Sequence, residues 1–527
     1  MMFKTAKELD RTEGTVELVS ANNEKQHLGT STIVLVPQPS QDVNDPLRWP
    51  QYKKHLAFSC ILLFTFLNNF TFDGPSAGFQ NIAIYFNITI NQVSGLLSWL
   101  VLALGLSNFF WIPTAAYFGK RPSFLVACST VFACAIWGAK AKSFNSLLAS
   151  TVVGGFGGGA SEAVGAAMVN DLYFLHERGK MMGIYMLAIS WGSSFGPLVG
   201  GFLIENLGWQ WQKWLSAILV GINLVLIFFF LPETRWNRVE EISPVQSGDE
   251  RSPNGSVKEP ATVETASEAI LSNQTYGTRN SFLKELNPWS GLDKNANLLN
   301  LFLKPFPLIV YPACTFALLA YSIALAPTVM VNIVSSPILE SPPYLFGSGI
   351  VGLTNVAGIV GQLGGFLLGG PLTDVYATYR ASRNNGIFLP ESRLPLLIVP
   401  SLIVVAGQLL FGFGVQHTLH WATLYVGYGM ISVGLTAIAT ISMTYVVESY
   451  YVVSQDCLEL VNGLKNVIAF GFVYATVPWT THEGYAKTFG ELSGVFCAIM
   501  LLAVPLFFWG PKIRHYTSTN WRLISVD

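Results

Sequence analysis

The chain has 527 residues, of which 51% are hydrophobic and only 12% are charged, and its mean hydropathy is +0.45. A soluble domain carries about 25% charged residues, and neither a water-soluble globule nor a disordered chain accommodates this much apolar surface. The formal net charge of −1 provides no basic field that would point to nucleic acid. None of the six cysteines forms a CxxC pair, which argues against a disulfide framework or a zinc site. The composition is that of a polytopic membrane protein.

Twelve runs are long and apolar enough to cross a bilayer, which takes roughly 20 residues per helix. The preceding segment is polar and proline-rich and lacks the apolar core of a signal peptide, so the first run is expected to be its own insertion signal. The third and ninth runs are short for a tilted crossing. The expected spans are 55–75, 94–115, 123–141, 146–170, 181–204, 212–231, 305–333, 347–372, 394–414, 420–446, 461–479 and 488–509.

A polar stretch divides these spans into two groups of six. Residues 239–300 are rich in Ser, Glu, Pro, Asn and Thr, and they predict a disordered linker that is too polar to pack a core. The predicted fold class is therefore an all-α membrane protein with twelve transmembrane helices in two six-helix bundles. We expect a cytoplasmic N-terminal segment at 1–54, a bundle at 55–231, a cytoplasmic linker at 232–304, a bundle at 305–509 and a cytoplasmic tail at 510–527.

The loop charges orient the predicted spans. With both termini in the cytoplasm, the short inner loops carry seven Lys and Arg residues against four in the outer loops, in agreement with the positive-inside rule. The sequon that begins at Asn87 then faces outside, where it is either glycosylated or unused. We expect a multi-pass protein of the plasma membrane, with the vacuolar membrane as the alternative. The four outer residues are Lys140, Lys142, Lys213 and Lys487.

Glycines recur at every fourth residue in three of the spans. Such a stripe lets a neighbouring backbone approach closely. It serves either static packing or the sliding of helices during a transport cycle. The stripes are Gly154 and Gly158, then Gly192, Gly196 and Gly200, and finally Gly361, Gly365 and Gly369.

The stripe of the fifth span runs through a proline, and residues 192–201 read GSSFGPLVGG. Pro197 removes a backbone donor, and the glycines around it, including Gly201, permit a bend. This segment resembles the antiporter motif GxxxGPxxGG of the major facilitator superfamily. Residues 113–122 (PTAAYFGKRP) are similar to the loop motif GxLxDRxGRR of that superfamily, and residues 370–374 (GPLTD) repeat its start in the second half. The resemblance implies the major facilitator fold.

Further segments resemble a fungal branch of the drug:H+ antiporter-1 family that includes polyamine and histidinol permeases. The resemblance covers most of residues 45–514 and implies transport of a small solute, driven by protons. The Arg that related proton antiporters carry in the fourth span is replaced by Thr151. The matching segments are 45–50 (DPLRWP), 171–180 (DLYFLHERGK), 390–394 (PESRL), 448–450 (ESY) and 462–466 (NGLKN).

Five polar residues at membrane depth are candidates for solute or proton binding. An ionisable residue at the centre of a spanning helix costs roughly 2.5–3.5 kcal/mol, so it usually faces a cavity or a partner. Glu162 on the fourth span either couples a proton to solute binding or belongs to a structural hydrogen-bond network. Asp73, near the outer end of the first span, either attracts a cation or caps the helix end in water. Asn332, Asn355 and Gln362 either contact the solute or bond helix to helix.

Charged residues at the predicted cytoplasmic ends have two interpretations. Lys120 and Arg121 either pair with Asp171 or Glu177 in a latch that breaks when the conformation changes, or they are only the positive-inside signal. Asp374 occupies the corresponding loop of the second half.

The sequence predicts a proton-coupled secondary transporter and not an enzyme. It has no GxxxxGK[ST] loop for a nucleotide, and His417 and His420 lack nearby acids or cysteines, so we expect no cofactor and no metal. The expected partners are a small-molecule solute, protons and the lipid bilayer, with no nucleic acid, and we expect a monomer. Export of a small organic compound such as a drug or secondary metabolite is the first interpretation. Uptake of a cationic nutrient such as a polyamine is the second, and a non-transporting nutrient sensor is the third.

Overall fold

The computed structural model describes residues 16–17, 42, 44–173, 175–236, 298–383, 387–450 and 453–519. Within these residues, 12 helices are long and apolar enough to cross a membrane, and each overlaps one of the expected spans. The all-α fold class is thereby confirmed. The predicted linker lies largely outside the described residues. One small element was not expected, because β1 (Val16–Glu17) pairs antiparallel with β2 (Ile387–Phe388).

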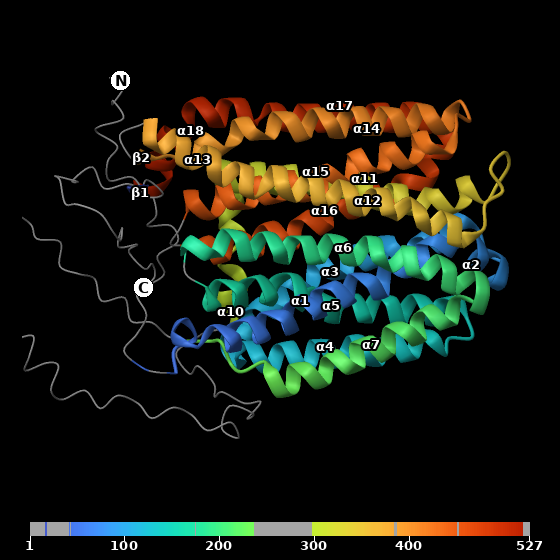
Figure 1. The fold of residues 1–527 in the computed structure, drawn as a ribbon, viewed down its shortest axis with the longest axis horizontal. Helices are drawn as coiled ribbons and strands as arrows, with labels where there is room; N and C mark the ends of the chain where they lie inside the picture. Colours follow the sequence, from blue (N-terminus) through green and yellow to red (C-terminus); the bar gives the residue numbers. More distant parts are fainter. Residues whose placement is uncertain are drawn as a thin grey trace, which may run out of the picture.

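The helices form two bundles that lie side by side (Figure 1). We call them the N bundle and the C bundle. The N bundle contains α1 (Gln51–Asp73), η3 (Gly74–Gly78), α2 (Phe79–Phe86), α3 (Ile90–Phe118), α4 (Lys120–Ala139), α5 (Phe144–Leu172), α6 (Leu175–Leu207) and α7 (Trp209–Phe230). The C bundle contains α11 (Pro312–Leu339), α12 (Ser348–Gly369), α13 (Pro371–Arg383), η5 (Pro390–Leu397), α14 (Ile398–Gln416), α15 (Trp421–Ser449), α16 (Ser454–Glu483), α17 (Tyr485–Leu501) and α18 (Ala503–Thr519).

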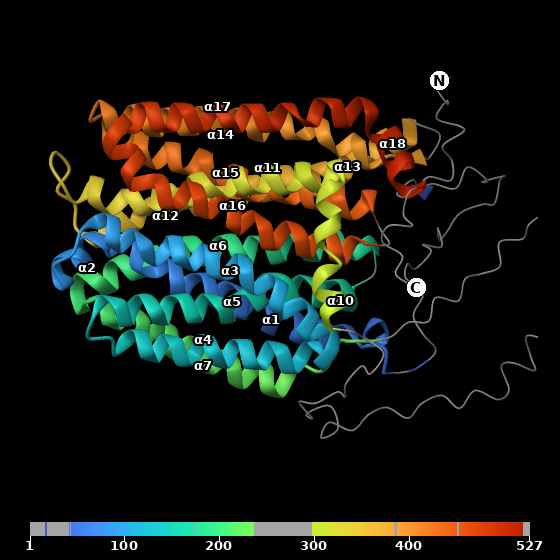
Figure 2. The same ribbon diagram turned by 180° about the vertical axis from the view of Figure 1, so that it is seen from behind.

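Two pairs of helices form most of the interface between the bundles. Helix α3 packs against α16, and α6 packs against α12. Helix α1 begins, and α18 ends, at the same end of the molecule, which we call the terminal end, and the opposite end is the far end (Figure 1). At the terminal end, the short helix α10 (Leu298–Leu303) lies against α3, as the view from behind shows (Figure 2). The elements η2 (Pro46–Arg48) and η4 (Phe306–Val310) precede α1 and α11.

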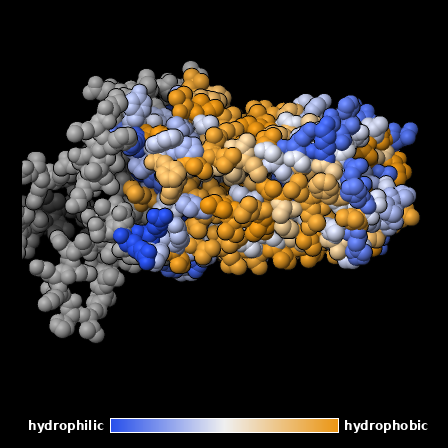
Figure 3. Space-filling view, turned by 90° about the horizontal axis from the view of Figure 1, so that it is seen from above, coloured by the Kyte–Doolittle hydropathy of each residue, from blue (hydrophilic) through white to orange (hydrophobic). Residues whose placement is uncertain are grey.

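An apolar belt covers the middle of the face shown in Figure 3, and more polar surface flanks it towards both ends. Large apolar side chains on several helices are more than half exposed, among them Ile222, Val360 and Leu402. A soluble protein would not leave so many of them in water. The belt is the surface that the hydrocarbon chains of a bilayer would cover.

Matching glycines close the same connection in each half. Gly208 joins α6 to α7 with a φ of 92°, and Gly484 joins α16 to α17 with a φ of 81°. L side chains disfavour this left-handed region, so glycine is the residue that permits both turns. The shared turn supports two halves of related architecture.

Two expectations about charged residues near the far end were wrong. The first span is longer than expected, because α1 continues through η3 and α2 to Phe86, and Pro75 occupies a first-turn position that tolerates proline. Asp73 therefore lies inside this helical run, and its side chain makes no capping hydrogen bond to η3. Lys213 is not a loop residue, because it lies in α7 with 3% of its surface exposed.

Candidate functional site

A buried ion pair joins the two bundles in the half of the molecule nearer the terminal end. Lys465 Nζ on α16 lies 3.1 Å from Glu162 Oε2 on α5, and the two side chains are 3% and 6% exposed. Asn466 Nδ2 donates a hydrogen bond to the same oxygen at 3.2 Å. The Lys465 ammonium also lies 4.1 Å from the centre of the Tyr321 ring on α11, whose negative face attracts a cation. Among the described residues, this is the ion pair that connects one bundle to the other.

The surroundings of Glu162 hold its backbone firmly in place. Helix α5 is rich in glycine here, and a Cβ added at Gly158 would lie only 2.1 Å from Asn68 Oδ1 on α1. The Tyr185 hydroxyl on α6 donates to the carbonyl of Ser161 and lies 3.2 Å from the carbonyl of Glu162. Close packing and these hydrogen bonds to the backbone fix the part of α5 that carries the Glu162 carboxylate.

The candidates Asn332 and Asn355 bond helix to helix in this conformation. The Tyr428 hydroxyl on α15 lies 3.1 Å from Asn332 Oδ1 on α11 and 3.2 Å from Asn355 Oδ1 on α12. All three helices belong to the C bundle. One hydroxyl proton serves two carbonyl oxygens, so this cluster has spare accepting capacity for a donor from a solute or from water.

Gln362 lies at the interface between the bundles. Its Nε2 donates to Ser194 Oγ at 2.9 Å, and Ser194 belongs to the proline-containing segment of α6. Its Oε1 is buried and has no partner among the described residues, and the same is true of both amide atoms of Asn68 on α1. An unpaired buried polar atom costs roughly 1–3 kcal/mol. These amides could therefore bind a polar solute that enters between the bundles.

Asp73 has its cation partner within the N bundle. Lys213 Nζ donates to the Thr71 carbonyl at 3.0 Å and lies 5.2 Å from the centre of the Phe72 ring, and its positive charge acts on the Asp73 carboxylate. Asp73 is only partly exposed. The structure does not bring it into contact with the Glu162–Lys465 pair.

The glycine stripes mainly bring helices of the same bundle together. On α6, added Cβ atoms would lie 2.3–2.8 Å from backbone carbonyls of α1 and η3, and the stripe of α12 faces α15 in the same way. The next glycine on α6, Gly201, faces the other bundle, where an added Cβ would lie 2.4 Å from the carbonyl of Ser348. The carbonyls that the α6 stripe faces belong to Phe66, Phe70 and Gly74.

The predicted latch residues are found at the terminal end of the N bundle. Lys120 Nζ at the start of α4 lies 2.5 Å from Asp171 Oδ2 at the end of α5. Arg121 instead donates from Nη2 to the carbonyl of Phe228 at 2.7 Å. The side chain of Glu177 lies outside the described residues. The described contacts of Lys120 and Arg121 therefore tie helices of one bundle together.

Asp374 takes part in the corresponding group of the C bundle. Arg393 on η5 donates from Nε and Nη2 to the two carboxylate oxygens of Glu448 on α15, both at 2.8 Å, and from Nη1 to Asp374 at 3.0 Å. A second pair joins Arg514 on α18 to Glu391 on η5 at 2.7 and 2.9 Å.

Sequence reasoning found Glu162 but missed its partners. Lys465 was noted only within the segment 462–466 and not as a site residue. The signal was present, because Lys465 is the only charged residue of the predicted span 461–479, and a charge at membrane depth calls for a partner. Tyr321 and Tyr428 carried no comparable signal, since aromatic residues are frequent in every span.

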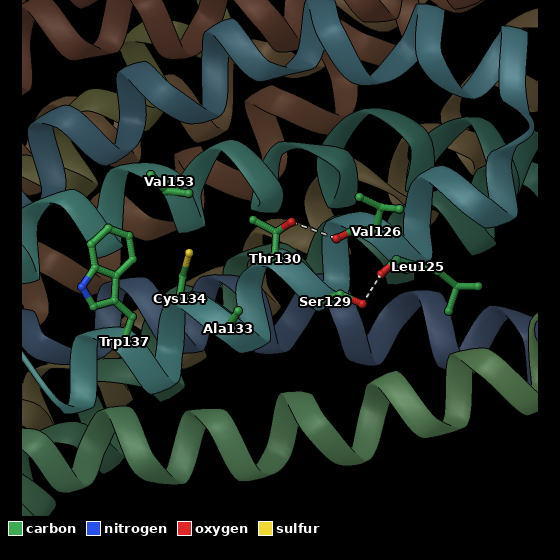
Figure 4. A pocket seen from close by; sticks show the side chains of 8 residues that line it. All are labelled: Leu125, Val126, Ser129, Thr130, Ala133, Cys134, Trp137 and Val153. Carbon is green, nitrogen blue, oxygen red and sulfur yellow. Dashed lines mark hydrogen bonds between the residues drawn. The ribbon is translucent and has the colours of Figure 1, made fainter.

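A shallow groove with a volume of about 660 Å³ lies on the outer face of α4, against α5 (Figure 4). Its lining is mostly apolar, and Val126, Trp137 and Val153 are strongly exposed around it. Lipid chains would fill it in a membrane, and it contains none of the candidate residues.

The comparisons with known proteins agree with this geometry. The sequence profile described as Major Facilitator Superfamily matches residues 61–478. An uncharacterized MFS-type transporter of Schizosaccharomyces pombe is 26% identical, over 93% of this chain and 89% of that protein. Protein HOL1 of Saccharomyces cerevisiae is 24% identical, over 98% and 97%. A probable efflux pump, mfs2, of Aspergillus flavus is 26% identical, over 82% and 96%.

A solved structure shows the same fold. The human organic anion transporter MFSD10 (TETRAN) matches with a TM-score of 0.54 and 16% identity, and the match covers 86% of this chain and 100% of that one. The profile covers most of the chain, and 12 membrane-length helices form its two bundles. The protein therefore belongs to the major facilitator superfamily and is a multi-pass membrane transporter.

Proposed function

We propose that the protein is a secondary active transporter that exports a small organic compound in exchange for protons by alternating access. The observation that carries the proposal is the Glu162–Lys465 pair, a compensated charge buried between two bundles. We take the terminal end as the cytoplasmic side. The proposal includes the finer relationship to the drug:H+ antiporter-1 family.

Protonation of Glu162 is the step that would couple a proton to movement. Breaking a buried pair by neutralising one partner costs about 3–5 kcal/mol, because the other charge stays buried without compensation. A proton on Glu162 leaves Lys465 in that state. Separation of the bundles then becomes favourable in free energy, because water or a solute can solvate the Lys465 ammonium. Proton binding would thus destabilise the closed arrangement.

The direction of transport rests on resemblance. The proline-containing segment of α6 resembles the antiporter motif, and it lies beside the bundle interface, where Gly201 faces Ser348 and Ser194 bonds Gln362. One relative, which matches this chain over 82% of its length, is named a probable efflux pump. Both observations favour export over import.

Uptake of a cationic nutrient such as a polyamine is the second candidate, and one observation favours it. The Lys465 ammonium lies between the Glu162 carboxylate and the Tyr321 ring, at 3.1 and 4.1 Å. A carboxylate and an aromatic face form the environment that an organic ammonium group prefers. A cationic solute would take the place of Lys465.

The remaining expectations belong to the same proposal. The protein would act as a monomer in the plasma membrane, or in the vacuolar membrane, without a cofactor. Asn87 is exposed at the far end, between α2 and α3, where an enzyme could attach a glycan. Mass spectrometry before and after glycosidase treatment tests that modification.

Flux measurements in liposomes test the proposed function. Purified protein is reconstituted, and a panel of cationic, anionic and neutral compounds is assayed with and without an imposed pH difference. We expect the pH difference to drive the flux of at least one compound in exchange for protons. We expect Glu162→Gln to lose this driven flux. The matched control is Glu491→Gln, which removes a carboxylate that is 45% exposed on α17. Driven flux that survives unchanged in Glu162→Gln would overturn the proposed coupling.

A further inference from the structure

A second buried carboxylate lies on the helix that carries Lys465. Glu459 is in the second turn of α16 at the terminal end, and only 2% of its surface is exposed. Its Oε1 has no hydrogen-bond partner among the described residues. Neither the ion pair at Glu162 nor the charge groups that hold each bundle together involve it.

Among the residues that the structure describes, no cation forms an ion pair with Glu459. The positive charge of Lys304, just before η4, acts on Glu459, but its Nζ lies 2.9 Å from Asp456 Oδ2 and its side chain is 43% exposed. Helices α3, α10 and α11 contain no Asp, Glu, Lys, Arg or His at all. The charged groups on α5 and α15 nearest the terminal end, Asp171 and Glu448, are bound to Lys120 and Arg393.

The helical spacing connects Glu459 to the interface pair. Residues 459, 463 and 466 follow one another at intervals of four and three, so they lie on one face of α16. On this face, Gly463 packs against the Phe109 ring of α3, and Asn466 donates to Glu162. The axial distance from Glu459 to Lys465 is about 9 Å, which one or two water molecules bridge once the helices separate.

Glu162 and Glu459 therefore have opposite charge states in this conformation. The Glu162 carboxylate is ionised, because an ammonium lies 3.1 Å away. A carboxylate buried without a cation of its own is so unfavourable that the group binds a proton instead. Glu162 lies on α5 and Glu459 on α16, and these two helices contact each other between the bundles.

We propose that Glu459 is a second proton-binding residue of the transporter, which holds the proton in the closed conformation and exchanges it between Glu162 and the terminal end. The inference rests on the proposed function and extends it. When the bundles separate at the terminal end, water reaches Glu459 and the ionised form becomes favourable. The proton is then released on that side.

Chemical labelling tests this proposal without a transported solute. Dicyclohexylcarbodiimide is an apolar reagent that modifies protonated carboxyl groups, and peptide mass spectrometry locates the adduct. In the full-length protein in liposomes, we expect modification at Glu459, decreasing as the pH rises, and none at Glu162. An unmodified Glu459 over the whole pH range, or an adduct at Glu162 alone, overturns the proposal.

A pair of variants sharpens the labelling experiment. Asp456→Asn frees the Lys304 ammonium to pair with Glu459, so modification of Glu459 should fall several-fold. Lys304→Met removes that cation, and modification should stay at the wild-type level or rise. Equal labelling of Glu459 in the two variants contradicts the assigned charge state.

Transport assays on two variants distinguish this inference from the proposed function. With a compound that the liposome panel identifies, Glu459→Gln should keep solute exchange without a gradient and lose accumulation driven by the pH difference. If Glu459→Gln accumulates solute normally while Glu162→Gln does not, only the role of Glu459 is wrong. If Glu162→Gln also accumulates solute normally, the proposed coupling itself fails.

Discussion

The arginine pairs inside the C bundle and the charge pair between the bundles are built differently. Inside the C bundle, Arg514 and Glu391 meet through two hydrogen bonds of 2.7 and 2.9 Å, and both side chains are at least 96% buried. Between the bundles, Lys465 meets Glu162 through one close contact of 3.1 Å. A guanidinium fork fixes a carboxylate in one geometry, whereas an ammonium is a point charge on a flexible stem.

The difference indicates which charges hold the fold and which can change partners. A two-pronged pair resists separation, so it suits a bundle that moves as one body. A single ammonium can leave its carboxylate and keep other contacts, and Lys465 also lies against the Tyr321 ring. The predictions below test this division, from the largest expected effect to the smallest.

Removal of Lys465 alone should have the largest effect on stability. Lys465→Met leaves Glu162 buried without its cation, and we expect a loss of about 3–5 kcal/mol in the free energy of unfolding. The double variant Glu162→Gln/Lys465→Met removes both charges and should recover at least half of this loss. Unfolding in detergent measures all three proteins. Losses that simply add in the double variant would show that the two side chains do not interact.

The pairs inside each bundle should affect stability and leave transport intact. Arg393→Ala uncouples Glu448, and we expect a loss of about 3 kcal/mol, against about 1 kcal/mol for Lys120→Ala, whose pair with Asp171 is partly exposed. Flux per folded molecule should stay within about twofold of the wild type, because neither pair crosses the interface. Loss of flux with a fully folded protein would instead support the latch interpretation of these residues.

Substitution of two adjacent glycines on α6 distinguishes packing within a bundle from packing between the bundles. A Cβ at Gly200 would lie 2.3 Å from the Gly74 carbonyl, and one at Gly201 would lie 2.4 Å from the Ser348 carbonyl. Gly200→Ala should cost about 1–3 kcal/mol of stability. Gly201→Ala should instead open the far end, because the neighbouring bundle can move away.

Thiol labelling of Asn81→Cys, in a background without other cysteines, reports on opening of the far end. Asn81 Nδ2 lies 3.3 Å from Ser348 Oγ across the interface, so its label is expected to react faster when the bundles part there. Gly364→Ala is the control, since a Cβ at Gly364 meets no atom within 4 Å. The distinction fails if Gly200→Ala and Gly201→Ala have the same effect on stability and on labelling.

The smallest expected effect is a pH dependence at the far end. Burial, together with the nearby negative charge of Glu205, raises the pKa of Glu340 from 4.5 to about 7, although the Ser336 hydroxyl opposes the shift. The Ser336 hydroxyl also accepts from the Gln80 amide of the N bundle, so Glu340 borders the closed interface. The closed arrangement therefore binds the proton more tightly than the open one.

Closure of the far end should accordingly be strongest below about pH 4.5 and should weaken as the pH rises from there to about 7. We expect a few-fold increase in Asn81→Cys labelling between acidic and alkaline pH. Glu340→Gln should abolish this increase. A pH profile that is the same with and without Glu340→Gln would assign the titration to another group.

The sequence predicted the fold better than the site, and particular residues explain why. Twelve spans follow from hydropathy alone, since the bilayer requires each helix to be apolar over its length. Asp73 was misplaced because Gly74 and Pro75 resemble a helix end, whereas proline in a first turn lets the helical run continue. Lys213 resembled a loop cation, but the packing of α7 against α1 and α4 buries it.

The partners of the candidate residues could not be predicted at all. Glu162 was identified as a costly charge, but its cation is far away in the chain and on the other bundle. Asn332 and Asn355 meet through the hydroxyl of Tyr428, which is one of 19 tyrosines with no distinguishing local pattern. Such pairings depend on how the two bundles are placed, and that placement is a property of the folded molecule.

Crosslinking at the far end tests the central claim, which is that the two bundles move against each other. In a background without other cysteines, Asn81→Cys/Ser348→Cys joins the bundles through a short bis-methanethiosulfonate reagent. Trp137→Cys/Ser146→Cys joins α4 to α5 within the N bundle, where the two native side chains are hydrogen-bonded at 3.0 Å. The account predicts that the first crosslink stops flux until a reductant removes it and that the second does not. Undiminished flux with the bundles crosslinked would contradict it.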